Sequence, residues 1–116
     1  IQYAYARLKS ILRKASYAGE VLPEIVDMDT HERNLLLHAA RFPEAMERVI
    51  ETWSPHLLAS YLFELAQRAN EFYHSHPVLS ETNEQKKEFL LMLVQIVATT
   101  LATGLYLLGI DAPEEM

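Results

Sequence analysis

The stretch from Phe89 to Ile110, FLLMLVQIVATTLATGLYLLGI, runs for 22 residues without a charged side chain. It is long enough to span a bilayer as a helix, but a helix that is apolar on all sides is also what the centre of a helical bundle requires. Gln95, three threonines and two glycines interrupt it, and Gly104 would let a neighbouring backbone approach closely. We therefore predict a buried core helix that ends at Gly109, with a membrane span as the alternative.

A first helix is predicted from about Ile1 to Ala18, because apolar residues recur there at spacings of three and four. These residues share one face of the helix: Ala4, Leu8, Ile11, Leu12 and Ala15. Gly19 is expected to end the helix and to begin a loop that extends to Thr30.

Two short helices are expected next. Asp29 followed by Glu32 is a capping signal for a helix that ends near Arg41. Pro43 suits the first turn of a third helix. One side of that helix is predicted to be apolar: Phe42, Met46, Val49, Ile50 and Trp53.

The fourth helix is predicted to begin at Ser54–Pro55 and to end near His74, before Pro77. Its apolar side comprises Leu58, Tyr61, Leu62, Leu65, Ala69 and Phe72. Thr82 and Gln85 offer a capping box for the last helix. Five helices with short connections predict an all-α antiparallel bundle around a central C-terminal helix. With 116 residues, the chain is expected to be one domain over residues 1–116.

Charge is divided unevenly along the chain. Residues 1–19 contain Arg7, Lys9, Arg13 and Lys14 and no acid, for +4, whereas residues 20–116 contain six bases and sixteen acids, for −10. An overall charge of −6 argues mildly against nucleic-acid binding. The basic first helix is a local exception.

The sequence contains no recognisable catalytic or metal-binding motif. The chain has no cysteine, which excludes disulfides and thiolate metal sites and is compatible with a reducing cytosol. His31 and Glu32 begin like a zinc-protease motif, but Leu35 stands where the second histidine belongs. His38 lies two turns away from His31, which is too far for joint ligation. We expect no catalytic residue, no metal and no cofactor in this chain.

Residues suited to single-stranded nucleic acid are present on two helices. Such binding needs flat side chains for stacking and cations for the backbone. Tyr3, Arg7 and Lys14 supply both on the first helix, and Tyr73 is expected to point outward on the fourth, next to a core residue, Phe72. From the residues alone, tyrosines that sit in the core with their hydroxyl groups at its rim are the stronger interpretation.

Five local matches in chain order resemble the C-terminal anticodon-binding domain of arginyl-tRNA synthetases. They are QYAYAR at 2–7, FPE at 42–44, a segment with PHL at 55–57, YL at 61–62 and LA at 65–66, NEFY at 70–73 and LLGIDAPEEM at 107–116. The family patterns are QYAHAR, FPE, PHxLxxYLxxLA, NxFY and LLGIxAPERM. The matches extend over the whole chain.

This resemblance implies a bundle that grips the anticodon stem-loop of tRNA-Arg within a longer, cytoplasmic arginine–tRNA ligase. ATP and Mg²⁺ would belong to the catalytic domain of that parent chain, which is also an expected partner. The implied tRNA-binding residues are Tyr3, Arg7, Lys14, Asn70, Tyr73 and Met116. Arg7 is also a candidate for a bridge to the catalytic domain. A monomer without membrane contact is expected.

Two residues depart from the family pattern, and one alternative function stays open. Tyr5 replaces the usual histidine, and Glu115 places a negative charge where the family has arginine, beside Met116. The alternative is a structural or protein-interaction bundle that binds no RNA.

Overall fold

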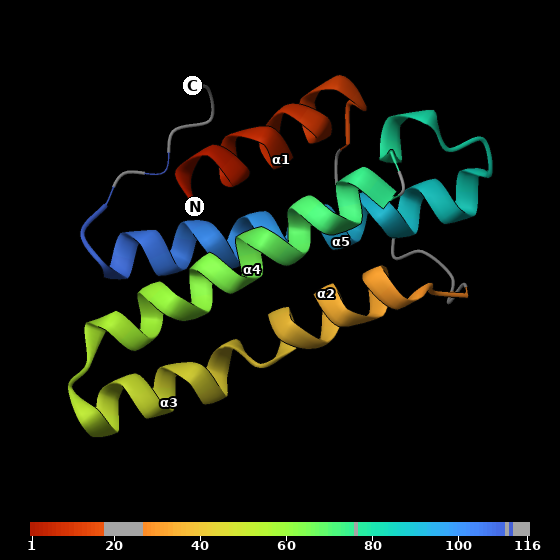
Figure 1. Ribbon diagram of the computed structural model, residues 1–116. Helices are drawn as coiled ribbons and strands as arrows, with labels where there is room; N and C mark the ends of the chain where they lie inside the picture. Colours follow the sequence, from red (N-terminus) through yellow and green to blue (C-terminus); the bar gives the residue numbers. More distant parts are fainter. Residues whose placement is uncertain (18–26, 76, 111, 113–116) are drawn as a thin grey trace.

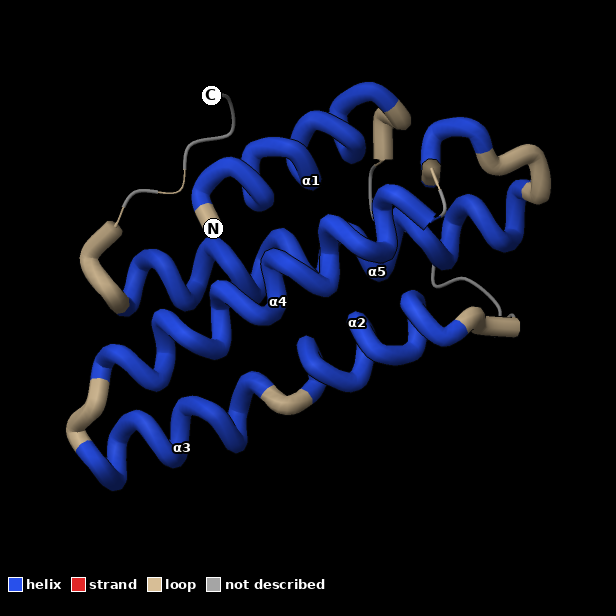
Figure 2. Tube along the Cα trace, in the orientation of Figure 1, coloured by secondary structure: helices blue, strands red, loops and turns tan. Residues whose placement is uncertain are grey.

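The computed structural model describes residues 1–17, 27–75, 77–110 and 112. These residues form five α-helices and one short 3-10 helix: α1 (Gln2–Lys14), α2 (Thr30–Ala40), α3 (Phe42–Thr52), α4 (Pro55–Ser75), η1 (Val78–Ser80) and α5 (Glu84–Leu107). In Figure 1, α4 and α5 lie along the middle of the molecule, with α1 on one side and α2 and α3 on the other. Figure 2 shows only helices and their connections in the described residues, which confirms the all-α prediction.

The predicted role of the uncharged stretch as the core is confirmed. α5 packs against α1, α2, α4 and η1, and its buried residues cover one broad side of the helix: Phe89, Leu90, Leu91, Leu93, Val94, Val97, Ala98, Leu101, Gly104 and Leu105. An exposed stripe with Ile96, Thr99, Thr103 and Tyr106 lies opposite. By length and composition α5 would also pass as a membrane span, although half of its most apolar part is buried inside the bundle. Core helices commonly meet both conditions.

Gly104 allows α4 and α5 to approach each other, although its closest neighbour is a side chain rather than the predicted backbone. A Cβ atom at Gly104 would lie 2.5 Å from Cδ2 of Leu62, which is itself fully buried. Any larger residue at this position would have to displace Leu62 from the core.

The prediction for the end of the first helix was wrong. α1 ends at Lys14, four residues early, because Ser16 adopts the left-handed conformation with a φ of 52°. The amide of Tyr17 then donates to the carbonyl of Leu12 at 3.1 Å, which is the closing bond of a Schellman motif. Serine thus takes the place usually held by glycine, and the predicted terminator, Gly19, lies outside the described residues.

The capping predictions were half right. At α2 the Glu32 amide donates to Asp29 Oδ1 at 2.8 Å, and the Asp29 amide donates to Glu32 Oε1 at 3.3 Å, which confirms the capping box. At α5 the cap is Asn83 rather than Thr82, since the Asn83 side chain accepts from the Lys86 amide at 3.2 Å. Asparagine is as good an N-cap as threonine.

Helix α3 departs most from its predicted packing. Phe42, Met46 and Val49 are half-buried as expected, but Ile50 is 60% exposed and Trp53 is 86% exposed. The main partner of α3 is α4, so only a narrow side of this short helix finds a partner.

Candidate nucleic-acid interface

Three of the predicted tRNA-binding residues meet at the contact between α1 and α4. The Arg7 guanidinium carbon lies 5.3 Å from the ring centre of Tyr3 and 5.4 Å from the ring centre of Tyr73. Tyr3 and Arg7 are one turn apart on α1, whereas Tyr73 comes from the last turns of α4. We call these three residues the aromatic–arginine cluster.

Core packing on both helices positions the cluster. Leu8 and Ile11 of α1 are buried, so the neighbouring stripe with Tyr3 and Arg7 faces away from the core. On α4, Phe72 is fully buried, and the next side chain, Tyr73, therefore points to a different side of the helix. That side adjoins α1.

The cluster combines two flat rings with one cation at the protein surface. Tyr3 is 60% exposed, and Arg7 and Tyr73 are half-buried. A cation over an aromatic ring contributes about 0.5–1 kcal/mol at an exposed site, and here one guanidinium is shared between two rings, so the three side chains hold one another in place. Exposed ring faces stack with bases, and a guanidinium binds phosphate oxygens.

The other predicted site residues stand in different relations to the cluster. Lys14 is exposed at the last residue of α1, two turns from Arg7, which is about 10 Å along the helix. Asn70 is half-buried one turn before Tyr73 on α4. Met116 lies outside the described residues, so its place in the site stays a prediction. Tyr5, which departs from the family pattern, is buried in the core.

A second aromatic contact, which no local sequence pattern predicted, lies between α2 and α4. His38 and Tyr61 stack with ring centres 4.4 Å apart and planes 15° apart. The Tyr61 hydroxyl donates to the His38 carbonyl at 2.5 Å, and His38 Nε2 lies 3.3 Å from the Tyr61 carbonyl. Burial raises the pKa of Tyr61 to about 12, and the nearby charge of Glu64 acts in the same direction. This contact ties the end of α2 to α4.

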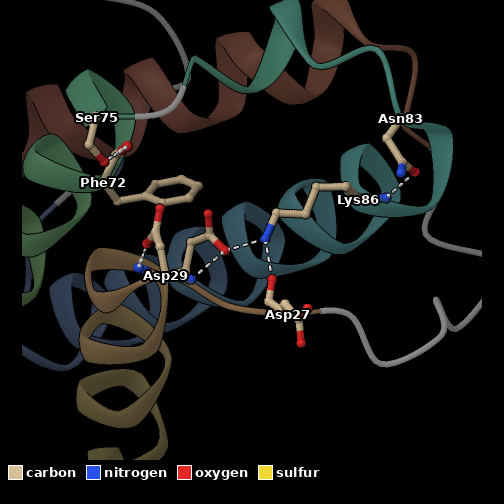
Figure 3. Close-up of polar contacts among 7 residues, drawn as sticks. Asp27, Asp29, Phe72, Ser75, Asn83 and Lys86 are labelled. Atoms are coloured by element: carbon tan, nitrogen blue, oxygen red, sulfur yellow. Dashed lines mark hydrogen bonds and ion pairs between the residues drawn. The ribbon is translucent and has the colours of Figure 1, made fainter.

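A buried ion pair joins the first turns of α2 and α5 (Figure 3). Glu32 is 1% exposed and pairs with Lys86, whose Nζ also donates to the Asp27 carbonyl at 2.6 Å. The second carboxylate oxygen of Glu32 has no partner among the described residues. The two residues are 54 positions apart, so no local pattern signals their contact. The pair fixes how α2 sits on α5.

The described histidines are placed as structural or surface residues. His31 is exposed on α2, and His38 is held in its stack with Tyr61. Burial lowers the pKa of His38, with smaller contributions in the same direction from Arg68 and Arg41, while the Tyr61 carbonyl and Glu64 oppose the shift. The described part of the chain contains no group of three His, Asp or Glu side chains that is arranged to hold a metal.

The site thus belongs to an all-helical module that presents a cation between two aromatic rings. The sequence model of one family, described as the DALR anticodon binding domain, matches residues 1–116. The chain therefore belongs to the DALR anticodon-binding domain family.

Comparison with known proteins and solved structures shows that this domain is similar to a part of arginine–tRNA ligases. The chain is 42% identical to the arginine–tRNA ligase of Ignicoccus hospitalis and 38% identical to that of Bacteroides fragilis. All of the chain aligns in both cases, but it spans only about one fifth of each relative (18% and 20%). Superposition on Thermus thermophilus arginyl-tRNA synthetase gives a TM-score of 0.89 at 43% identity, over 99% of this chain and 20% of the other. The Plasmodium falciparum enzyme gives 0.76 at 27% identity, over 98% and 20%.

Proposed function

We propose that this chain is the module with which an arginine–tRNA ligase binds the anticodon stem-loop of tRNA-Arg. The observation that carries the proposal is the position of Arg7 between the rings of Tyr3 and Tyr73. It gathers one cation and two stacking surfaces from separate helices in a domain of an anticodon-binding family. Lys14 and Asn70 would extend the contact, and Met116 would complete it.

The chemistry of ligation would take place elsewhere in a longer chain. This module would hold the anticodon arm, while a catalytic domain of the same polypeptide would bind ATP and Mg²⁺ and join arginine to the acceptor end. We expect that protein to act in the cytoplasm as a monomer without membrane contact. Since residues 20–116 carry a charge of −10, we expect the isolated chain to bind RNA weakly and to lose affinity as salt rises.

Titration of the chain with a tRNA-Arg anticodon stem-loop tests the proposal. A stacked base is worth about 1–3 kcal/mol, so Tyr73→Ala is expected to weaken binding by about 5- to 150-fold. Trp53→Ala is the matched control, because Trp53 is a highly exposed aromatic residue at the C-cap of α3, a helix that lies on the other side of α4 and α5 from α1 (Figure 1). The affinity of the Trp53→Ala variant for the RNA is expected to stay within twofold of that of the unaltered chain.

Removal of Met116 forms a separate arm of the same experiment. We expect a loss of affinity comparable with that of Tyr73→Ala if the last residue reaches the same RNA loop. Equal affinity of the unaltered chain and Tyr73→Ala would exclude the cluster from the site. An absence of RNA binding at any salt concentration would favour the alternative, a helical bundle that binds no RNA.

A further inference from the structure

A cleft of about 690 Å³ lies where α2 and α3 meet the middle of α4. Three arginines line it: Arg41 from the junction of α2 and α3, Arg48 from α3 and Arg68 from α4. The chain contains six arginines in total, so half of them border one cleft of a protein whose net charge is −6. We call this feature the arginine cleft.

Among the described residues, one of these arginines forms an ion pair with an acid. Arg68 Nη2 donates to Glu64 Oε1 at 2.8 Å. This hydrogen bond lowers the pKa of Glu64, so the carboxylate is ionised at neutral pH. Arg68 Nε is buried and has no acceptor among the described residues, while Arg41 and Arg48 take no part in the ion pair. Three arginines against Glu44 and Glu64 leave the lining with a net charge of +1.

Two stacked rings form part of the cleft wall. They belong to His38 and Tyr61, which are joined by the hydrogen bond between α4 and the end of α2. Burial lowers the pKa of His38 and so favours its uncharged ring. The positive charge of the cleft therefore comes from its guanidinium groups.

We propose that the arginine cleft is a phosphate-binding site. A guanidinium group donates two parallel hydrogen bonds to phosphate oxygens, and a phosphate has enough oxygens to be shared among several arginines. The volume lies in the range of about 300–1,000 Å³ that is usual for sites of small ligands. The phosphate belongs either to an RNA backbone or to a free nucleotide or pyrophosphate.

This site is separate from the aromatic–arginine cluster. The cluster is formed by α1 and the last turns of α4, whereas the cleft is formed by α2, α3 and the middle of α4. The inference rests on the proposed function only if the phosphate is part of RNA. A free nucleotide or pyrophosphate would occupy the cleft whether or not the cluster binds an anticodon.

The test follows the arginine side-chain NMR signals during separate titrations with pyrophosphate, ATP and the anticodon stem-loop. We expect at least one of these probes to shift the signals of Arg41, Arg48 and Arg68. The double variant Arg41→Gln/Arg48→Gln should bind that probe at least tenfold more weakly. The double variant Arg33→Gln/Lys87→Gln removes the same charge outside the cleft and should bind within twofold of the unaltered chain. Matching melting temperatures establish that both variants are folded.

The outcomes separate the two sources and the two proposals. A response to pyrophosphate or ATP assigns a free phosphate ligand, and a response to RNA alone assigns the RNA backbone. Tyr73→Ala should leave the pyrophosphate response unchanged, and the cleft variant should leave the Tyr73 ring response to RNA in place. The proposal is overturned if no probe moves the arginine signals, or if both double variants weaken binding equally.

Discussion

Tyr61 and Tyr73 lie twelve residues apart on α4, and they use the same side chain in opposite ways. The Tyr61 ring is buried against His38 and its hydroxyl donates to a backbone carbonyl of α2. Tyr73 is half-buried beside Arg7, and its hydroxyl makes no hydrogen bond to another described residue. Tyr61 therefore stabilises the fold with both its ring and its hydroxyl, whereas the hydroxyl and part of the ring of Tyr73 remain accessible to a ligand. Burial and partners, rather than residue type, distinguish the two roles.

The largest expected contrast is in stability after truncation. Tyr61→Ala should lower the free energy of unfolding by about 3–5 kcal/mol, because it leaves a cavity in the core and removes the stack with His38. Tyr73→Ala should cost about 1 kcal/mol, since only part of its ring is buried. Urea denaturation followed by circular dichroism measures both values. Equal losses would mean that Tyr73 is as structural as Tyr61.

The hydroxyl groups alone give the next contrast. Tyr61→Phe removes one of the two donors to the His38 carbonyl, which keeps the Arg41 amide, and should cost about 0.5–1.5 kcal/mol. Tyr73→Phe should leave the free energy of unfolding unchanged within about 0.5 kcal/mol, because its hydroxyl has no described partner. Urea denaturation followed by circular dichroism measures both of these values as well. A destabilised Tyr73→Phe variant would reveal a structural bond at that hydroxyl.

A smaller effect of pH on the free energy of unfolding is expected from His38, which stacks on Tyr61. Since the pKa of His38 is lowered in the folded state from its ordinary value of 6.5, the unfolded chain takes up this proton first as pH falls. The contribution of neutral His38 to stability is therefore complete above pH 6.5 and declines between pH 6.5 and its lower folded pKa. Chemical denaturation across that range should show a shallower decline for His38→Gln. Parallel curves would contradict the role assigned to burial.

The smallest expected effect is at the aromatic–arginine cluster. Arg7→Gln removes the cation from both rings and should cost about 0.5–1 kcal/mol at this partly exposed site. Arg7→Lys keeps the charge and should recover part of that loss. Thermal denaturation detects the difference, and a loss above about 2 kcal/mol would show that Arg7 is needed for the fold itself.

Local pattern was sufficient for most of the fold. The uncharged stretch from Phe89 to Ile110 identified α5 as the core because few other environments accept a helix that is apolar on all sides. The box of Asp29 and Glu32 fixed the start of α2, since both hydrogen bonds lie within four residues. The end of α1 was missed because Ser16 takes a conformation that sequence rules assign to glycine.

The candidate sites depended more on tertiary contacts. Tyr3 and Arg7 were predictable together, because residues four apart share a helix face. That Tyr73 joins them required the packing of α1 on α4, which no local pattern encodes. The same applies to the stack of His38 on Tyr61 and to the arginine cleft, whose three arginines are up to 27 residues apart in the chain.

Glu32 has two partners at once, the Asp29 amide at the start of its own helix and Lys86 in α5. Opening the first turn of α2 would leave the ammonium group of Lys86 without its counter-ion, and opening the first turn of α5 would leave the carboxylate alone in the interior. Neither turn gains by fraying on its own. The amides of both turns should therefore exchange their hydrogens for deuterium at a common rate, as one cooperative unit built from segments far apart in the chain.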